Sequence, residues 1–296
     1  MSEESLRPTF KHWLEGTRPH TWANAFAPVI VGSGTAAIHD GFVWWKAILA
    51  AFVSWALIVG VNYANDYSDG IRGTDTDRSG PLRLTGSGIA QPTQVKRAAF
   101  IAFSAAGVAG IVLSISSNWW LIAVGLLCVL AAWFYTGGKN PYGYRGLGEV
   151  AVFIFFGLVA VMGTQFTQLG SITREGLLAA IAIGSMSAGV NLVNNLRDIP
   201  TDTVSGKITL AVRLGDKRTR ILFLFLITVP FIVTTILLLN SRWNALGYLY
   251  IPLVFHAAQP VCHGKKGKAL IPVLGKTGRA MVVWAIASSI AFFVFP

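Results

Sequence analysis

Nine long hydrophobic stretches alternate with polar segments along the chain. They cover approximately residues 21–38, 44–63, 98–115, 119–136, 148–169, 176–195, 220–240, 243–261 and 277–295. A helix needs about 20 mostly apolar residues to cross the roughly 30 Å hydrocarbon core of a bilayer. Backbone groups in lipid must hydrogen-bond within their own segment, and a barrel would show shorter alternating strands. The pattern therefore predicts an all-α, polytopic membrane bundle of nine transmembrane helices.

Composition supports this class of protein. The 296 residues are 53% hydrophobic and only 12% charged, with a mean hydropathy of +0.58. An ordinary soluble domain carries about 25% charged residues, so a pair of soluble domains is excluded. The first 20 residues are polar, which indicates no cleavable signal peptide, and two cysteines make neither a disulfide framework nor a metal-ligand cluster.

The basic residues predict an orientation. If the N-terminus is cytoplasmic, 21 of the 24 Lys and Arg residues lie on that side, and only Lys46, Arg174 and Arg242 lie outside. This distribution favours a cytoplasmic N-terminus and an external C-terminus. The chain has 24 basic residues and 13 acidic ones. In a membrane protein, such an excess of basic residues indicates cytoplasmic loops and binding of anionic lipid or phosphate. We therefore expect no nucleic-acid partner. The longest polar loops share the cytoplasmic face, where we expect the active site.

An acidic motif at the end of the second stretch has a partner four stretches later. Asn62-Tyr-Ala-Asn65-Asp66-Tyr-Ser-Asp69 aligns with Asn191-Leu-Val-Asn194-Asn195-Leu-Arg-Asp198. An even offset leaves both motifs on the same membrane face, as in a parallel repeat. We therefore predict one domain over 1–296, with parallel halves at roughly 21–136 and 148–261 and a last helix at 277–295.

Each motif forms one polar stripe, because offsets of three, four and seven share a helix face. Two facing stripes would make a ring of carboxylate and amide oxygens, which suits Mg²⁺. Neighbouring loops supply the bases Arg72, Arg78, Arg83, Lys139, Lys207 and Arg213. Acids alone would suit an ion pathway, whereas acids among bases favour a metal-bridged diphosphate. The Asn and Asp residues of the motifs could instead simply cap helices or form turns. That interpretation does not explain why polar residues also occur further back, inside the apolar helices.

These residues resemble the UbiA superfamily of intramembrane prenyltransferases. The family's Asn-Asp-x-x-Asp-x-x-x-Asp matches Asn65-Asp66-Tyr-Ser-Asp69, although its third acid falls on Gly73 and the next acids are Asp75 and Asp77. Asp198-Ile-Pro-Thr-Asp202 is similar to the second acidic motif, and Tyr135-Thr-Gly-Gly-Lys139 is similar to the family's Tyr-x-x-x-Lys. The stretches NDYSDGIRGTDTDRSGP, PYGYRGLGEVAVFIFFG and NNLRDIPTDTVSGKITLAVRLG most resemble the branch that prenylates 1,4-dihydroxy-2-naphthoate.

The resemblance implies a role for each motif residue. Metal ligands would be Asp66, Asp69, Asp75, Asn195, Asp198 and Asp202. Catalysis would depend on Asp66, Asp69, Asp198 and Asp202 with Lys139 and Lys207. Substrates would contact Asn62, Asn65, Arg72, Arg78, Tyr135, Asn191, Asn195 and Arg213.

The same resemblance implies the reaction. A Mg²⁺-dependent enzyme of the cell membrane would transfer a polyprenyl chain from its diphosphate to 1,4-dihydroxy-2-naphthoate, releasing CO₂ and giving demethylmenaquinone for menaquinone biosynthesis. Its other partner is membrane lipid. The alternatives are another aromatic acceptor, such as 4-hydroxybenzoate or homogentisate, and a secondary transporter. Prenyl chain length, an acceptor-side base and the oligomeric state are left open.

Overall fold

The computed structural model describes residues 8–73 and 82–294, and within these ranges the chain is helical, with no β-strand. The α-helices are α1 (Phe10–Gly16), α2 (Ala23–Ala37), α3 (Trp44–Ile71), α4 (Pro92–Ile115), α5 (Leu121–Phe134), α6 (Gly148–Val152), α7 (Gly163–Leu169), α8 (Arg174–Val204), α9 (Leu210–Leu237), α10 (Ile251–Cys262) and α11 (Ile271–Val294). A π-helix, Phe153–Met162, joins α6 to α7. Short 3₁₀ segments lie at Pro19–Thr21, Tyr142–Arg145, Arg242–Tyr250 and Gly267–Leu270. The predicted all-α class is confirmed.

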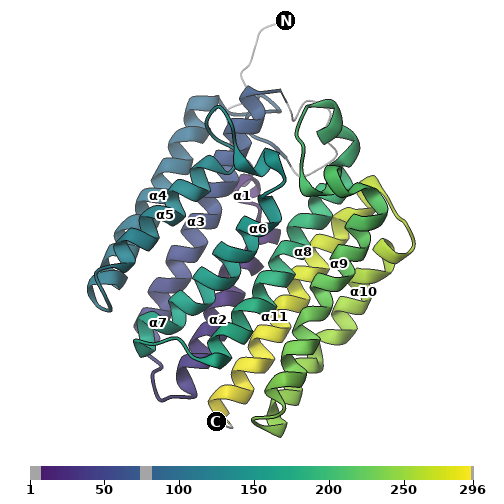
Figure 1. Cartoon of the computed structure of the whole chain (residues 1–296). Helices are drawn as coiled ribbons and strands as arrows, with labels where there is room; N and C mark the ends of the chain where they lie inside the picture. Colours follow the sequence, from purple (N-terminus) through teal and green to yellow (C-terminus); the bar gives the residue numbers. More distant parts are fainter. Residues whose placement is uncertain (1–7, 74–81, 295–296) are drawn as a thin grey trace, which may run out of the picture.

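The helices form one bundle around α8 (Figure 1). In the most apolar window of α8, 78% of the residues are buried, against 33% for α4 and for α9. α8 packs against α9, α11, α2 and the π-helix, and α3 packs against α4 and α2. The motif-bearing helix α8 therefore lies at the centre of the molecule.

The number of spanning helices differs from the expectation of nine. Among the described residues, seven helices are long and apolar enough to cross a membrane: Trp44–Ile71, Pro92–Ile115, Gly148–Leu169, Arg174–Val204, Leu210–Leu237, Arg242–Cys262 and Gly267–Val294. The predicted spans 21–38 and 119–136 contain α2 and α5, which have only 15 and 14 residues. At 1.5 Å per residue, such helices are about 22 Å long, shorter than the hydrocarbon core. A nine-span count therefore does not follow from helix length and composition.

Both motif helices are longer than their apolar cores. α3 continues past the predicted end at 63 to Ile71, and α8 continues past 195 to Val204. The acidic residues from Asp66 to Asp69 and from Asp198 to Asp202 therefore lie on helices and not in loops. The two helices end at the same end of the bundle, the upper end in Figure 1.

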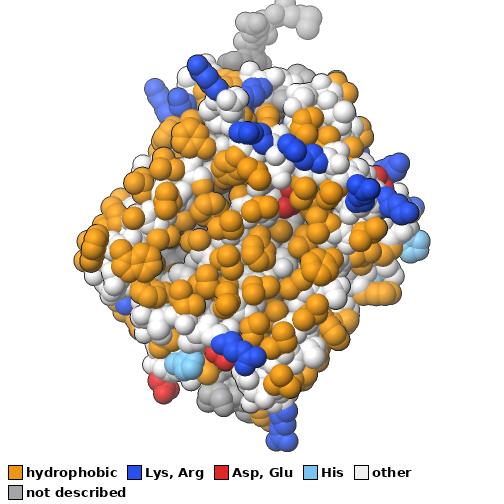
Figure 2. All heavy atoms as spheres, in the orientation of Figure 1, with side chains coloured by type: hydrophobic (Ala, Val, Ile, Leu, Met, Phe, Trp, Pro, Cys, Tyr) orange, Lys and Arg blue, Asp and Glu red, His pale blue; other side chains and the backbone are white. Residues whose placement is uncertain are grey.

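The outer surface has the character expected of a lipid-facing protein. Figure 2 shows hydrophobic side chains covering most of the visible face, with Lys and Arg gathered mainly near the upper end. Exposed large apolar residues on α4 and α5 include Ile101, Val108, Leu126 and Leu127. A contiguous apolar surface of this extent indicates contact with membrane lipid.

A close contact between two glycines brings the π-helix against α8. A Cβ atom added at Gly157 would lie 2.5 Å from the Gly184 Cα and 2.7 Å from the Ala180 carbonyl oxygen. Backbone atoms cannot yield as a flexible side chain can. The contact therefore requires glycine at position 157.

Gly157→Ala is expected to destabilise the fold by about 1–3 kcal/mol, the range typical of overpacking. Gly163→Ala is the matched control, because a Cβ atom there meets nothing within 4 Å. Thermal unfolding of the two purified variants in the same detergent measures the difference. Equal melting temperatures for the two variants would show that the contact between Gly157 and α8 does not require glycine.

Candidate active site

A chamber of about 650 Å³ lies inside the bundle and extends along α3 from Ala50 to Asp69. Its polar wall includes Arg18, His20, Asn24, Asn62, Asn65, Asp69, Arg83, Tyr135, Asn191, Asn194, Asn195 and Lys207. Its apolar wall comes from α3, α4, α5 and the π-helix, and includes Phe100, Phe103, Leu121, Phe155, Phe156 and Val159. The chamber can therefore hold a molecule with a charged head and an apolar tail.

The first stripe, on α3, lines the chamber with Asn62, Asn65 and Asp69. The Asn62 side-chain Nδ2 donates to the Thr17 carbonyl oxygen at 2.9 Å and to the Thr21 hydroxyl at 3.0 Å. The Asn65 side-chain Oδ1 accepts a 2.7 Å hydrogen bond from the Thr136 hydroxyl. Each asparagine is thus held in place by a segment distant in sequence.

Asp66 lies on the same helix but is turned away from the chamber wall. Its Oδ2 accepts from the Leu84 backbone N–H, and its Oδ1 accepts from the Thr85 N–H, both at 2.8 Å. The side chain is 1% exposed. Asp66 therefore holds the returning segment against α3, and any metal contact would have to share oxygens already used.

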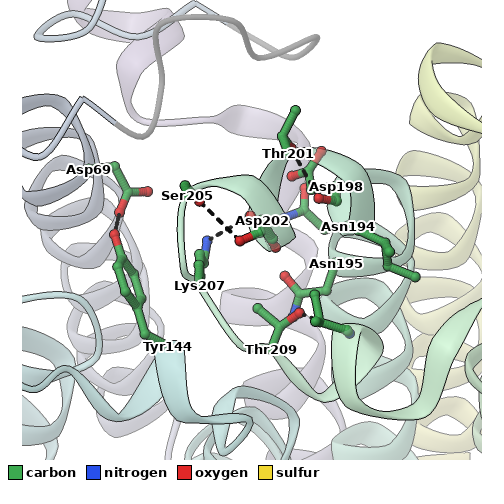
Figure 3. A network of polar contacts seen from close by, with 12 residues as sticks. Asp69, Tyr144, Asn194, Asn195, Asp198, Thr201, Asp202, Ser205, Lys207 and Thr209 are labelled. Atoms are coloured by element: carbon green, nitrogen blue, oxygen red, sulfur yellow. Dashed lines mark hydrogen bonds and ion pairs between the residues drawn. The ribbon is translucent and has the colours of Figure 1, made fainter.

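Asp69 is linked to the second motif through Tyr144, which comes from the loop after α5 (Figure 3). The Tyr144 hydroxyl donates to Asp69 Oδ1 at 2.5 Å, and Arg83 lies 3.8 Å from Asp69 Oδ2. The Tyr144 ring has Lys207 Nζ at 5.2 Å and the Arg72 guanidinium at 5.3 Å from its centroid. Such cation–π contacts are favourable inside a protein. Tyr144 therefore connects Asp69 of the first motif with Arg72 and with Lys207.

The second stripe, on α8, lines the chamber with Asn191, Asn194 and Asn195. Asp198 is 3% exposed and accepts two hydrogen bonds, of 2.6 and 2.7 Å, from the neighbouring Arg197 guanidinium. Asp202, one turn further, lies 3.8 Å from Lys207 Nζ.

A glycine places Lys207 beside Asp202. Gly206 has φ +75°, the left-handed conformation that ends helices and favours glycine. The chain then reverses, and the Lys207 backbone N–H donates to the Asp202 carbonyl oxygen at 2.9 Å. In Figure 3, Lys207 lies between Asp69 and Asp202.

Three of the predicted bases, Arg72, Lys139 and Arg213, do not line the chamber. Lys139 and Arg213 are exposed. Arg72 donates to the carbonyl oxygens of Thr136 and Gly138, which secures the loop after α5. Asp75, Asp77 and Arg78 lie outside the described residues. The described cations in the wall are Arg18, Arg83 and Lys207.

The N-terminal segment contributes two wall residues of unusual character. Arg18 has a left-handed backbone, with φ 53°, which is uncommon for a non-glycine residue. Burial lowers the pKa of His20 to about 4, and repulsion from Arg18 and Arg197 adds to the effect. The imidazole is therefore neutral at physiological pH.

Comparison with known proteins decides the family. The model of the UbiA prenyltransferase family matches residues 25–270. The chain belongs to the UbiA prenyltransferase family. Among its UbiA relatives, 1,4-dihydroxy-2-naphthoate octaprenyltransferase from Mycobacterium tuberculosis is 54% identical over 279 residues, which cover 94% of this chain and 96% of the relative. The protein of that name from Escherichia coli is 33% identical over 304 residues, covering 99% and 98%.

Solved UbiA structures share the fold. The apo UbiA homologue from Aeropyrum pernix K1 has a TM-score of 0.64 at 19% identity, over 92% of this chain and 97% of that one. The homologue from Archaeoglobus fulgidus bound to GPP and Mg²⁺ has a TM-score of 0.62 at 13% identity, over 95% and 99%. The described helices therefore adopt the UbiA fold.

The donor set of this UbiA site fits Mg²⁺, although the described residues contain no group of three or more His, Cys, Asp or Glu placed to hold a metal ion. Mg²⁺ is usually held by one or two carboxylates and completes its shell with water and substrate phosphates. Asp69 on α3, and Asp202 with Asn195 on α8, supply such hard oxygens at two separate points. A diphosphate would complete either set.

Sequence reasoning missed several residues of this site, including Arg18, His20 and Asn24 of the chamber wall and two residues that contact the motifs. Tyr144 and Glu149 both stand in PYGYRGLGEVAVFIFFG, a stretch singled out only for its family resemblance. Tyr144 contacts Asp69, 75 positions earlier, and Glu149 contacts Asn195, 46 positions later. An acidic residue at the start of a strongly apolar helix was the one available signal for Glu149.

Proposed function

We propose that this chain is a Mg²⁺-dependent prenyltransferase that moves a polyprenyl chain from its diphosphate to 1,4-dihydroxy-2-naphthoate, releases CO₂ and thereby makes demethylmenaquinone for menaquinone biosynthesis. The observation that carries it is the chamber, whose polar wall joins the two asparagine-rich motifs and whose apolar wall extends among α3, α4, α5 and the π-helix. The acceptor is supported by relatives whose names specify this naphthoate.

The reaction balances without a base. The allylic C–O bond breaks, and its electron pair leaves with the diphosphate. The ring carbon that carries the carboxylate forms the new C–C bond, and the carboxylate then leaves as CO₂ with its bonding electrons returning to the ring. The product is the quinol form of demethylmenaquinone, and no proton has to be removed from that carbon.

In this proposal, the chamber residues orient the substrates and neutralise charge. Lys207 and Arg83 would bind the diphosphate oxygens, on which negative charge grows as the C–O bond breaks. Asp69 and Asn195 line the chamber, and together with Asp66, Asp198 and Asp202 they would hold Mg²⁺. When bound, Mg²⁺ supplies Lewis-acid stabilisation of the leaving diphosphate. The apolar wall would exclude water from the allylic cation.

The proposal also covers the membrane arrangement. The UbiA fold and seven long apolar helices indicate a multi-pass membrane protein. We infer a cell-membrane location, a cytoplasmic active site and N-terminus, and an external C-terminus. The two parallel halves, 21–136 and 148–261, would each contribute one stripe, and α2 and α5 would complete nine crossings where the bilayer is locally thinner.

An acceptor panel tests the proposal. Purified protein in lipid nanodiscs should release diphosphate and form a prenylated naphthoquinol from 1,4-dihydroxy-2-naphthoate, polyprenyl diphosphate and Mg²⁺. Faster turnover of 4-hydroxybenzoate or homogentisate would identify another acceptor. Solute flux coupled to an ion gradient, without diphosphate release, would indicate a transporter.

Removing divalent metal is expected to abolish turnover, because the substrate head and the acids of the site all carry negative charge. Excess EDTA should lower diphosphate release to background, and added Mg²⁺ should restore it. Ca²⁺, added at the same concentration, should restore much less, because its larger and more flexible shell fits a small diphosphate site poorly. Full turnover in EDTA would contradict the assignment of the acids.

A further inference from the structure

Glu149, in the first turn of α6, is a buried carboxylate that contacts two of the three asparagines of the second stripe, Asn191 and Asn195. Its side chain is 5% exposed. Its Oε1 accepts from the Asn195 amide nitrogen at 2.6 Å and from the Asn191 amide nitrogen at 3.3 Å. Its Oε2 is buried and receives no hydrogen bond. Glu149 does not itself line the chamber, whereas Asn191 and Asn195 do.

Hydrogen-bond chemistry makes this contact directional. An asparagine side chain ends in an NH₂ donor and a carbonyl acceptor, and the two can exchange places by a flip about the last bond. Glu149 Oε1 can only accept. It therefore selects the orientation in which each NH₂ group faces α6 and each amide oxygen is turned away from it. The Asn191 oxygen in this orientation lies 3.4 Å from the Tyr135 hydroxyl, which donates to it.

Packing leaves little freedom for another arrangement. A Cβ atom added at Gly148 would lie 2.9 Å from the Tyr135 hydroxyl oxygen and 3.2 Å from the Asn191 amide nitrogen. The start of α6 therefore lies directly on this pair of side chains. Burying a carboxylate costs free energy unless hydrogen bonds offset it. Two amide donors on a single oxygen supply that compensation here.

We infer that Glu149 is a positioning residue, which orients Asn191 and Asn195 so that their amide oxygens serve the Mg²⁺–diphosphate complex. The inference rests on the proposed function, because that complex is the ligand. Glu149 acts through the asparagines and does not serve as a base, since it lies outside the chamber wall and the reaction releases CO₂ in place of a proton. Partners of this kind behind metal ligands typically change metal affinity or activity 10–100-fold.

Glu149→Gln and Glu149→Leu separate orientation from charge. Gln keeps an acceptor oxygen for the two amides, and its NH₂ group replaces an oxygen that receives no hydrogen bond, so we expect kcat and the half-saturating Mg²⁺ concentration within about threefold of wild type. Leu has a similar size and no acceptor, so the half-saturating Mg²⁺ concentration should rise about tenfold or more. Glu175→Leu, near the opposite end of α8, is the matched control and should change neither value.

Mn²⁺ binding gives a readout that is independent of turnover. Electron paramagnetic resonance titration of Mn²⁺ into each variant, with a non-hydrolysable prenyl diphosphate analogue present, should show weaker binding for Glu149→Leu only. If Glu149→Gln is as impaired as Glu149→Leu, the carboxylate charge is what matters, and the positioning role is overturned. Unchanged Mn²⁺ affinity in Glu149→Leu also overturns it.

A second set of variants keeps the test independent of whether the leucine variant folds. Asn195→Asp at pH 8 places two carboxylates in contact and should weaken Mn²⁺ binding about tenfold or more. Adding Glu149→Gln restores a donor–acceptor pair and should return the affinity to within about threefold of wild type. Lack of rescue contradicts the positioning role. Failure of the wild-type enzyme to prenylate the naphthoate would instead contradict the proposed function.

Discussion

Asp69→Asn is expected to lower the rate of diphosphate release on the order of a thousandfold, because the chamber loses the negatively charged oxygen that would face the metal–diphosphate head. Asp69 is the one acid of the first stripe that lines the chamber. Its carboxylate is already held by Tyr144 and Arg83, so Asn preserves size while removing charge. Measurement of kcat and of the half-saturating Mg²⁺ concentration should show both effects together.

Asp40→Asn is the matched control for this prediction. Asp40 is exposed in the turn between α2 and α3, at the opposite end of α3 from Asp69. It has φ 55°, a conformation that Asn also adopts readily. Turnover should remain within about twofold of wild type, the scale of surface substitutions away from special features. Loss of activity in both variants would point to a general effect on folding.

Lys207→Met is expected to reduce kcat about a hundredfold, because it removes a cation from the wall where charge grows on the leaving diphosphate. Lys207 lines the chamber and lies 3.8 Å from Asp202. Met keeps the length and apolar stem of the side chain. The effect should appear in single-turnover diphosphate release, which isolates the chemical step.

Lys139→Met tests whether a lysine contributes to turnover because it belongs to a family motif or because it lines the chamber. The family resemblance alone gives Lys139 and Lys207 similar roles, but Lys139 is exposed and does not line the chamber. We expect Lys139→Met to stay within about threefold of wild type. A larger loss than that of Lys207→Met would show that the loop after α5 moves over the substrate.

Much of the fold follows from patterns that are local in sequence. Apolar runs predict where long helices lie, and offsets of three and four predict that Asn62, Asn65 and Asp69 share a face, as the chamber shows. Helix lengths were less predictable. α2 begins only after the Pro19–Thr21 turn, and α5 ends at Phe134, before Tyr135. Hydrophobicity does not reveal such boundaries, because the flanking residues are apolar as well.

The partners of the motif residues were not predictable, because they are set by tertiary contacts. Asp66 accepts from backbone N–H groups 18 and 19 positions later, and main-chain donors have no sequence signature. Asp66 and Asp69 are three residues apart, so their positions differ by only about 60° around the helix, a sixth of a turn, yet only Asp69 lines the chamber. The motif assigns Asp66 and Asp69 the same role, whereas the structure gives them different surroundings.

The chamber has one polar and one apolar wall, and this difference affects how the two products are released. Before reaction, one molecule is held by two opposite kinds of surface, because its head is highly charged and its tail is apolar. After reaction these parts belong to separate products. The diphosphate retains every charge-based contact and none of the apolar ones, so we expect it to leave toward water, whereas the prenylated quinol has lost its charged anchor and partitions into lipid. Cleavage of the C–O bond thus separates the charged contacts from the apolar ones, so that each product is bound by only one kind of surface and leaves by its own route.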